Sequence, residues 1–167
     1  METTANTNLF VKMTVSAWET ECTRVTKLLN ELSDEQLMKD TAPGRNSGKY
    51  LLGHLTAVSD NMQTLLEWGE VLFPQLVQMY IRTPDKSGAE GPSINDLRDF
   101  WKAVNERIAG NISKMKPEDW FAKHTAVSAE DFLKEPHRNK LNVLISRTNH
   151  MSYHRGQLVY LSKNVRE

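Results

Sequence analysis

Residues 93–112 read S-I-N-D-L-R-D-F-W-K-A-V-N-E-R-I-A-G-N-I, and this stretch decides the fold class. Its apolar residues recur every three or four positions, which is the spacing of one buried helix face. Ser93, followed three residues later by Asp96, forms a capping-box-like start for this helix, with Asp in place of the usual Glu. The buried face extends over Ile94, Leu97, Trp101, Val104, Ile108, Ile112 and Met115.

Two more helices are predicted on the N-terminal side of this stretch. The first has an apolar face that starts at Val11 and ends before Ser33, where a short capped turn follows. That face comprises Val11, Val15, Trp18, Cys22, Val25, Leu29 and Leu32. The second helix begins after the N-cap candidate Ser47 and extends to about Glu70, with Leu51, His54, Val58, Asn61, Met62 and Leu65 on its inward arc.

A fourth helix is predicted from about Arg138 to Lys163. The polar loop T-P-D-K-S-G-A-E-G-P at 83–92 precedes the third helix, and an irregular connection with short helical turns covers 117–137. No alternation typical of strands is evident. Four long helices predict an all-α, four-helix bundle in which residues 1–167 form a single domain.

The composition is that of a soluble globular protein, with 39% hydrophobic and 25% charged residues. Lys and Arg number 21 and Asp and Glu also number 21, so we expect no field that attracts nucleic acid. No apolar run is long enough to span a membrane, and no signal peptide is visible. The single cysteine, Cys22, suits a reducing compartment, so a cytoplasmic location is expected.

Three histidines form the candidate metal site. In the stretch N-H-M-S-Y-H-R-G-Q at 149–157, His150 and His154 lie four residues apart and therefore share one helix face. That face is the apolar side of the fourth helix, and His54 lies on the inward arc of the second. Buried imidazoles need polar partners, and a cation supplies them; three ligands also leave a fourth position open, as in catalytic sites. Alternatively, these histidines are hydrogen-bonded core residues or surface residues at the end of a bundle.

The element is not fixed by these residues. Nitrogen ligands favour zinc or nickel, and they also accept iron, cobalt, manganese or copper.

These motifs resemble the DinB-like superfamily, also described as DinB/YfiT-like metalloenzymes. The resemblance rests on H-M-S-Y-H-R-G-Q at 150–157, on S-G-K-Y-L-L-G-H-L at 47–55 with the preceding P-G-R-N loop, and on the chain length. It implies an up-down-down-up bundle, usually a homodimer, with His54, His150 and His154 on zinc or nickel. Family members with assigned chemistry include S-transferases that use bacillithiol and isomerases that use mycothiol.

Four further residues are singled out near the histidines. Gln157 lies on the same arc as His154 and is a candidate for hydrogen-bonding a metal-bound water or orienting a ligand, and Arg147 is a candidate for binding a substrate carboxylate. Asn61 is a candidate partner or pocket-wall residue. The alternatives are that Gln157 and Asn61 are satisfied core amides and that Arg147 extends to the bundle end or pairs with an acid. Gly156 destabilises a helix interior, which predicts close approach of another helix there.

The reaction type is inferred from the shortage of carboxylates. Met151 follows His150, so the H-E-x-x-H arrangement of metalloproteases is absent. Metal-activated thiol chemistry requires less proton transfer by side chains, which favours an S-transferase that uses a low-molecular-weight thiol and a small-molecule substrate. A metal-dependent hydrolase and a non-catalytic metal-binding bundle are the alternatives.

Overall fold

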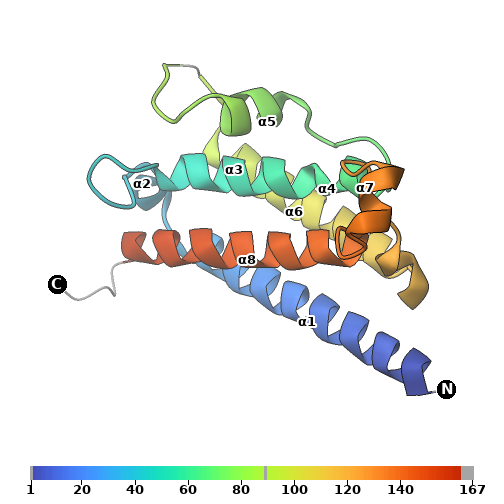
Figure 1. Cartoon of the computed structure of the whole chain (residues 1–167). Coiled ribbons are helices and arrows are strands. Elements are labelled where there is room, and N and C mark those ends of the chain that lie inside the picture. The colour runs from blue at the N-terminus through green and yellow to red at the C-terminus, as the bar shows by residue number, and fades with distance from the viewer. Residues whose placement is uncertain (1, 89, 163–167) are drawn as a thin grey trace.

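The protein is all-helical, as expected from the sequence. The computed structural model describes residues 2–88 and 90–162, and within them it contains no strand, only isolated bridge pairs at Asp40–Ser47 and Lys123–Asn139. Four long helices dominate the fold: α1 (Glu2–Glu31), α3 (Gly48–Asp60), α6 (Ile94–Ile112) and α8 (Lys140–Leu158). α1 packs along α8, and α3 packs against both α6 and α8. In Figure 1, α1 and α8 run in one direction, and α3 and α6 run in the other.

Short helical segments connect these four. α2 (Asp34–Leu37) and α4 (Met62–Leu65) flank α3, while α5 (Gln75–Val77) continues into the π-helix η1 (Gln78–Arg82). The 3₁₀-helix η2 (Pro117–Phe121) and α7 (Ala129–Lys134) precede α8, and a second 3₁₀ turn, η3 (Val159–Leu161), follows it. α5 and η1 lie against α3 on the side away from α8 (Figure 1), which brings their backbone next to the middle of α3.

The predicted helix starts are confirmed at the capping residues. The Ser47 hydroxyl accepts a hydrogen bond from the Tyr50 amide, and Ser93 forms a full capping box with Asp96. Each cap satisfies amide groups that have no partner inside the helix, and typically contributes about 1 kcal/mol.

The core forms where the predicted apolar faces meet. Buried side chains come from all four long helices, among them Trp18, Leu29, Leu51, Leu55, Trp101, Ile108, Leu144 and Met151. Burial of each such side chain stabilises the fold by about 1.5–3 kcal/mol. The contact between α3 and α8 therefore has a fixed geometry, and polar residues on their facing sides are held in place by the surrounding core.

α1 extends beyond the predicted apolar face: the helix begins at Glu2, and Val11 is the first buried residue among those whose burial is described. Three predicted helix limits differ from the structure, one in α3 and two in the last helix. α3 ends at Asp60, not near Glu70; α4 is a separate turn, and the chain then reverses through Glu67 and Gly69, whose φ angles are 61° and 125°.

The last helix is also shorter than predicted. α8 starts at Lys140 because the Asn139 side chain caps it, and its regular part ends at Leu158, where the chain tightens into η3. The predicted endpoint, Lys163, lies outside the described residues.

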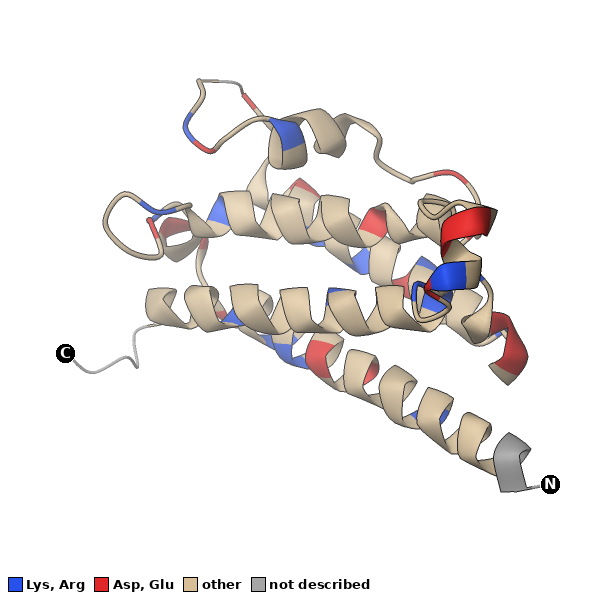
Figure 2. Cartoon of the chain, viewed as in Figure 1, with Lys and Arg blue, Asp and Glu red and all other residues tan. Residues whose placement is uncertain are grey.

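Charges of both signs are interspersed over the helices (Figure 2), in agreement with the balanced composition. Among the described residues, no helix is long and apolar enough to cross a membrane.

Candidate metal centre

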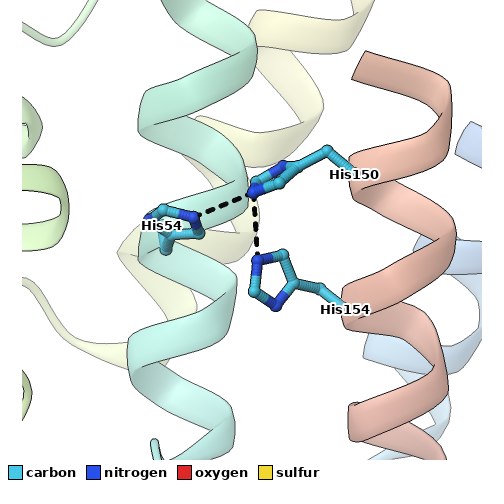
Figure 3. A group of neighbouring side chains, drawn as sticks. All are labelled: His54, His150 and His154. Atoms are coloured by element: carbon cyan, nitrogen blue, oxygen red, sulfur yellow. Dashed lines mark hydrogen bonds between the residues drawn. The ribbon is translucent and has the colours of Figure 1, made fainter. Parts of the chain in front are cut away.

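His54, His150 and His154 meet between α3 and α8. The Nε2 atom of His150 lies 3.2 Å from Nε2 of His54 and 3.0 Å from Nε2 of His154. One ligand atom from each residue falls within 4.8 Å of the other two. Figure 3 shows the three rings pointing toward one another, His54 from α3 and the other two from successive turns of α8.

The outer nitrogens of two rings define their tautomers. Nδ1 of His54 lies 2.7 Å from the carbonyl oxygen of Tyr80, which only accepts, so this Nδ1 carries the hydrogen. Nδ1 of His154 lies 2.7 Å from Oε1 of Gln157 and donates in the same way. A neutral imidazole has one hydrogen, so the Nε2 atoms of His54 and His154 both present lone pairs to the centre.

This arrangement fits a cation better than it fits a closed hydrogen-bond network. Nε2 of His150 can donate one hydrogen to one of its two neighbours, so at least one lone pair remains without a donor among these rings. Buried polar atoms without partners are unfavourable. A divalent ion that accepts all three lone pairs removes this penalty, and Nδ1 hydrogen bonds of this kind are typical of histidines that bind metals.

The surroundings keep His150 and His154 neutral. Burial, and after it the positive charge of His154, His54 and Arg147, lowers the pKa of His150 to about 4. Burial also lowers the pKa of His154, although the hydrogen bond to Gln157 opposes this shift. Neutral imidazole is the form that binds metal, so near neutral pH an incoming ion displaces no proton from these two rings.

The packing of η1 on α3 sets the position of His54. A Cβ atom on Gly53 would lie 2.5 Å from ring atoms of Tyr80, so the absent side chain at Gly53 is what allows η1 to approach. Tyr80 then presents its carbonyl to His54 from the C-terminal half of a helical segment, where carbonyls lack partners inside the helix. Tyr50, one turn before His54, stacks on the His54 ring with centroids 6.3 Å apart, and its hydroxyl donates to the carbonyl of Thr83.

The other singled-out residues occupy different positions. Gln157 lies next to His154 and also donates to the hydroxyl of Tyr153 at 3.3 Å. Arg147 lies one turn before His150, and its Nε is sealed from solvent with no hydrogen-bond partner. Asn61 is at the junction of α3 and α4, and its side chain makes no hydrogen bond to the described histidines. Gly156 is exposed and a Cβ there would meet open space, so the predicted close helix approach at Gly156 is wrong.

Sequence reasoning missed Tyr50 and Tyr80. Tyr50 carries a usable signal, because an aromatic residue four positions before a histidine lies on the same helix face. Tyr80 acts through its main-chain carbonyl, and no side-chain pattern marks such an acceptor.

The described fold and site together define an all-helical protein with a three-histidine centre between two of its long helices. A model of the DinB superfamily matches residues 17–158, so the chain belongs to the DinB superfamily and the resemblance seen in its motifs is confirmed. Among solved structures, the crystal structure of a conserved protein from Enterococcus faecalis is similar, with 16% identity and a TM-score of 0.61 over 90% of this chain and 93% of that one. At this identity the likeness concerns the fold alone. No curated protein matches the sequence.

Proposed function

We propose that the protein is a divalent-metal-dependent enzyme, a transferase that joins a low-molecular-weight thiol to a small electrophile. The observation that carries this proposal is the convergence of three imidazole Nε2 atoms. Nε2 of His150 lies 3.2 Å from that of His54 and 3.0 Å from that of His154, and the cluster contains no Asp or Glu. Zinc or nickel suits such a donor set best, and iron, cobalt, manganese or copper is also compatible with it.

The ion would supply a Lewis acid that favours a thiolate over a thiol. The chain's own residues orient the histidines. His54 and His154 are oriented by the Tyr80 carbonyl and the Gln157 amide, and Tyr50 covers one side of the His54 ring. His54, His150 and His154 would hold the ion and leave room beside it for a thiol sulfur. In the reaction the thiol releases its proton to solvent, the sulfur forms a bond to the electrophilic carbon, and the leaving group departs with the bonding electron pair.

The lack of a carboxylate favours this reaction over hydrolysis. Hydrolysis by a metal usually requires a general base beside the nucleophilic water. The cluster contains only histidines, and Cys22 is not a rival nucleophile, because burial raises the pKa of its thiol to about 11.

The test combines metal analysis with two activity panels. Protein loaded with zinc or nickel is assayed for conjugation of glutathione, bacillithiol or mycothiol to an electrophile, and separately for esterase and amidase activity. Conjugation that disappears in His150→Ala supports the transferase. Hydrolysis without conjugation would mean that the protein is a metal-dependent hydrolase and not a transferase. Bound metal without either activity would favour a non-catalytic binding bundle.

We also propose that α1, α3, α6 and α8 form the up-down-down-up four-helix bundle, with residues 1–167 as one domain. Support comes from the pairing of α1 with α8 and of α3 with α6, and from the helix directions visible in Figure 1.

A homodimer is the assembly we propose, through the exposed side of α1. Leu9, Phe10 and Met13 are 57%, 50% and 61% exposed, and the last two border a groove of about 250 Å³ that also contacts Ile145 of α8. Apolar side chains beside an apolar groove form a self-complementary surface for a two-fold contact, and a net charge of zero opposes association little.

Light scattering tests the dimer. Met13→Glu should change the measured mass from that of a dimer to that of a monomer. Leu133→Glu should not, although Leu133 on α7 is 84% exposed. A monomeric wild type would rule out the dimer.

A further inference from the structure

Arg147 is a cation beside the candidate metal centre that lacks a counter-ion. It lies on α8 three residues before His150 and seven before His154, so all three side chains leave the same helix face. Its Nε is sealed from solvent without a hydrogen-bond partner, and the guanidinium forms no ion pair with any described residue. Arg155, two turns further along α8, contrasts with it, because Nε of Arg155 donates to Glu21 at 2.5 Å.

Arg147 is placed next to the histidines by the periodicity of α8. Because it lies one helical turn before His150 on the same face, a small molecule bound at the three-histidine centre can extend along α8 toward its guanidinium.

The buried acids of the chain are engaged elsewhere. Asp60 accepts hydrogen bonds from the amides of Leu72 and Phe73, and Glu21 pairs with Arg155. These are the two carboxylates among the buried residues that the structure describes. Burial lowers the pKa of Arg147, which is the expected response of a cation that is partly removed from water without a partner.

We propose that Arg147 binds the carboxylate of a ligand whose thiol occupies the three-histidine centre. This inference rests on the proposed function and narrows it, because the substrate class becomes carboxylate-bearing thiols. A guanidinium binds a carboxylate through two parallel hydrogen bonds, which lysine does not reproduce. The ligand therefore meets two points of the site, its sulfur at the histidine centre and its carboxylate one helical turn away on α8.

The experiment compares two thiols that differ in charge. Zinc-loaded full-length protein is titrated calorimetrically with 3-mercaptopropionate and with 3-mercapto-1-propanol. In the wild type the carboxylate thiol should bind at least tenfold more tightly. Arg147→Gln should remove this preference by weakening only the carboxylate thiol, and Arg147→Lys should restore part of it. Arg138→Gln, which changes an arginine paired with Glu135 before α8, is the matched control and should keep the full preference. An undiminished preference in Arg147→Gln overturns the inference.

A second titration separates this inference from the proposed function. Propionate and propionamide differ in charge in the same way but have no thiol. If neither thiol binds, the thiol chemistry fails, and the propionate titration then decides the role of Arg147 alone. Propionate that binds the wild type at least tenfold more tightly than Arg147→Gln supports the carboxylate site, and equal or undetectable binding overturns it. Reduced binding by Arg147→Gln should not come from unfolding. The substitution removes an unpaired, half-buried charge and should leave the unfolding midpoint unchanged or higher.

Discussion

Two polar side chains of α3, Asp60 and His54, are placed in contrasting environments. Both oxygens of the buried Asp60 carboxylate accept hydrogen bonds, from the amides of Leu72 at 3.0 Å and Phe73 at 2.8 Å. His54 donates from Nδ1 to the Tyr80 carbonyl, but its Nε2 faces Nε2 of His150 at 3.2 Å and must share with His154 the one hydrogen that His150 can offer. A buried polar group that is fully satisfied within the chain stabilises the fold, whereas imidazoles that face each other with lone pairs indicate a site that binds a cation.

The largest expected effect is the loss of metal binding when a histidine is removed. His54→Ala, His150→Ala and His154→Ala should each weaken zinc affinity by about 10²-fold or more, since a site that binds zinc by roughly 10–16 kcal/mol divides this energy among a few ligands. Competition with a chromophoric chelator measures the affinity. The stability of the metal-free variants should change little. His137→Ala, at an exposed position, should bind zinc like the wild type, and equal affinity in all four variants would disprove the centre.

Asp60→Ala should show the opposite pattern to the histidine variants, with lower stability and nearly unchanged zinc affinity. It removes an acceptor from the Leu72 and Phe73 amides, and hydrogen bonds to a charged group contribute about 1.5–3 kcal/mol each. We expect the free energy of unfolding to fall by about 3 kcal/mol, measured in urea, while zinc affinity at 10 °C stays within about threefold of wild type. A large loss of affinity in the folded variant would mean that the two regions of α3 are not independent.

Gln157→Leu should weaken the centre without dismantling it. The variant removes the acceptor of the Nδ1 hydrogen of His154, so that ring loses its preferred tautomer and orientation. Residues in this position usually change metal affinity by about 10- to 100-fold, and we expect the lower end because Gln157 is half-exposed. Gln157→Glu retains an acceptor and should bind zinc at least as tightly as the wild type. If Gln157→Leu binds zinc normally, the hydrogen bond to His154 has no role in the centre.

Helix faces and the histidines were predictable because both follow helical periodicity. The spacing of Ile94, Leu97 and Trp101 defines a buried stripe, and the spacing of His150 and His154 places them together on one face. The end of α3 was not predictable from the same pattern, since apolar residues continue through Leu65 and Leu66 although the chain turns at Glu67.

The support of His54 depends on contacts that leave little trace in the sequence. Tyr80 contributes a carbonyl, and η1 reaches α3 only because Gly53 has no side chain. The sequence instead drew attention to Gly156, which proves to be exposed. A glycine within a helix signals a possible close contact, but the partner that makes the contact comes from the tertiary structure.

The smallest expected effect concerns acid and the metal-free protein. The pKa of His150 is lowered to about 4 in the folded chain, whereas an unperturbed histidine titrates near pH 6.5. Between these values the unfolded chain binds a proton that folded His150 does not, so stability falls as the pH decreases from about 6.5 toward 4. The effect is modest because the ring is only half-buried.

Urea unfolding of His150→Gln should show a smaller loss of stability over this range than the wild type, while His137→Gln should match the wild type. Parallel curves for wild type and His150→Gln would mean that the histidine centre accepts protons freely and is not the constrained set of lone pairs that distinguishes it from Asp60.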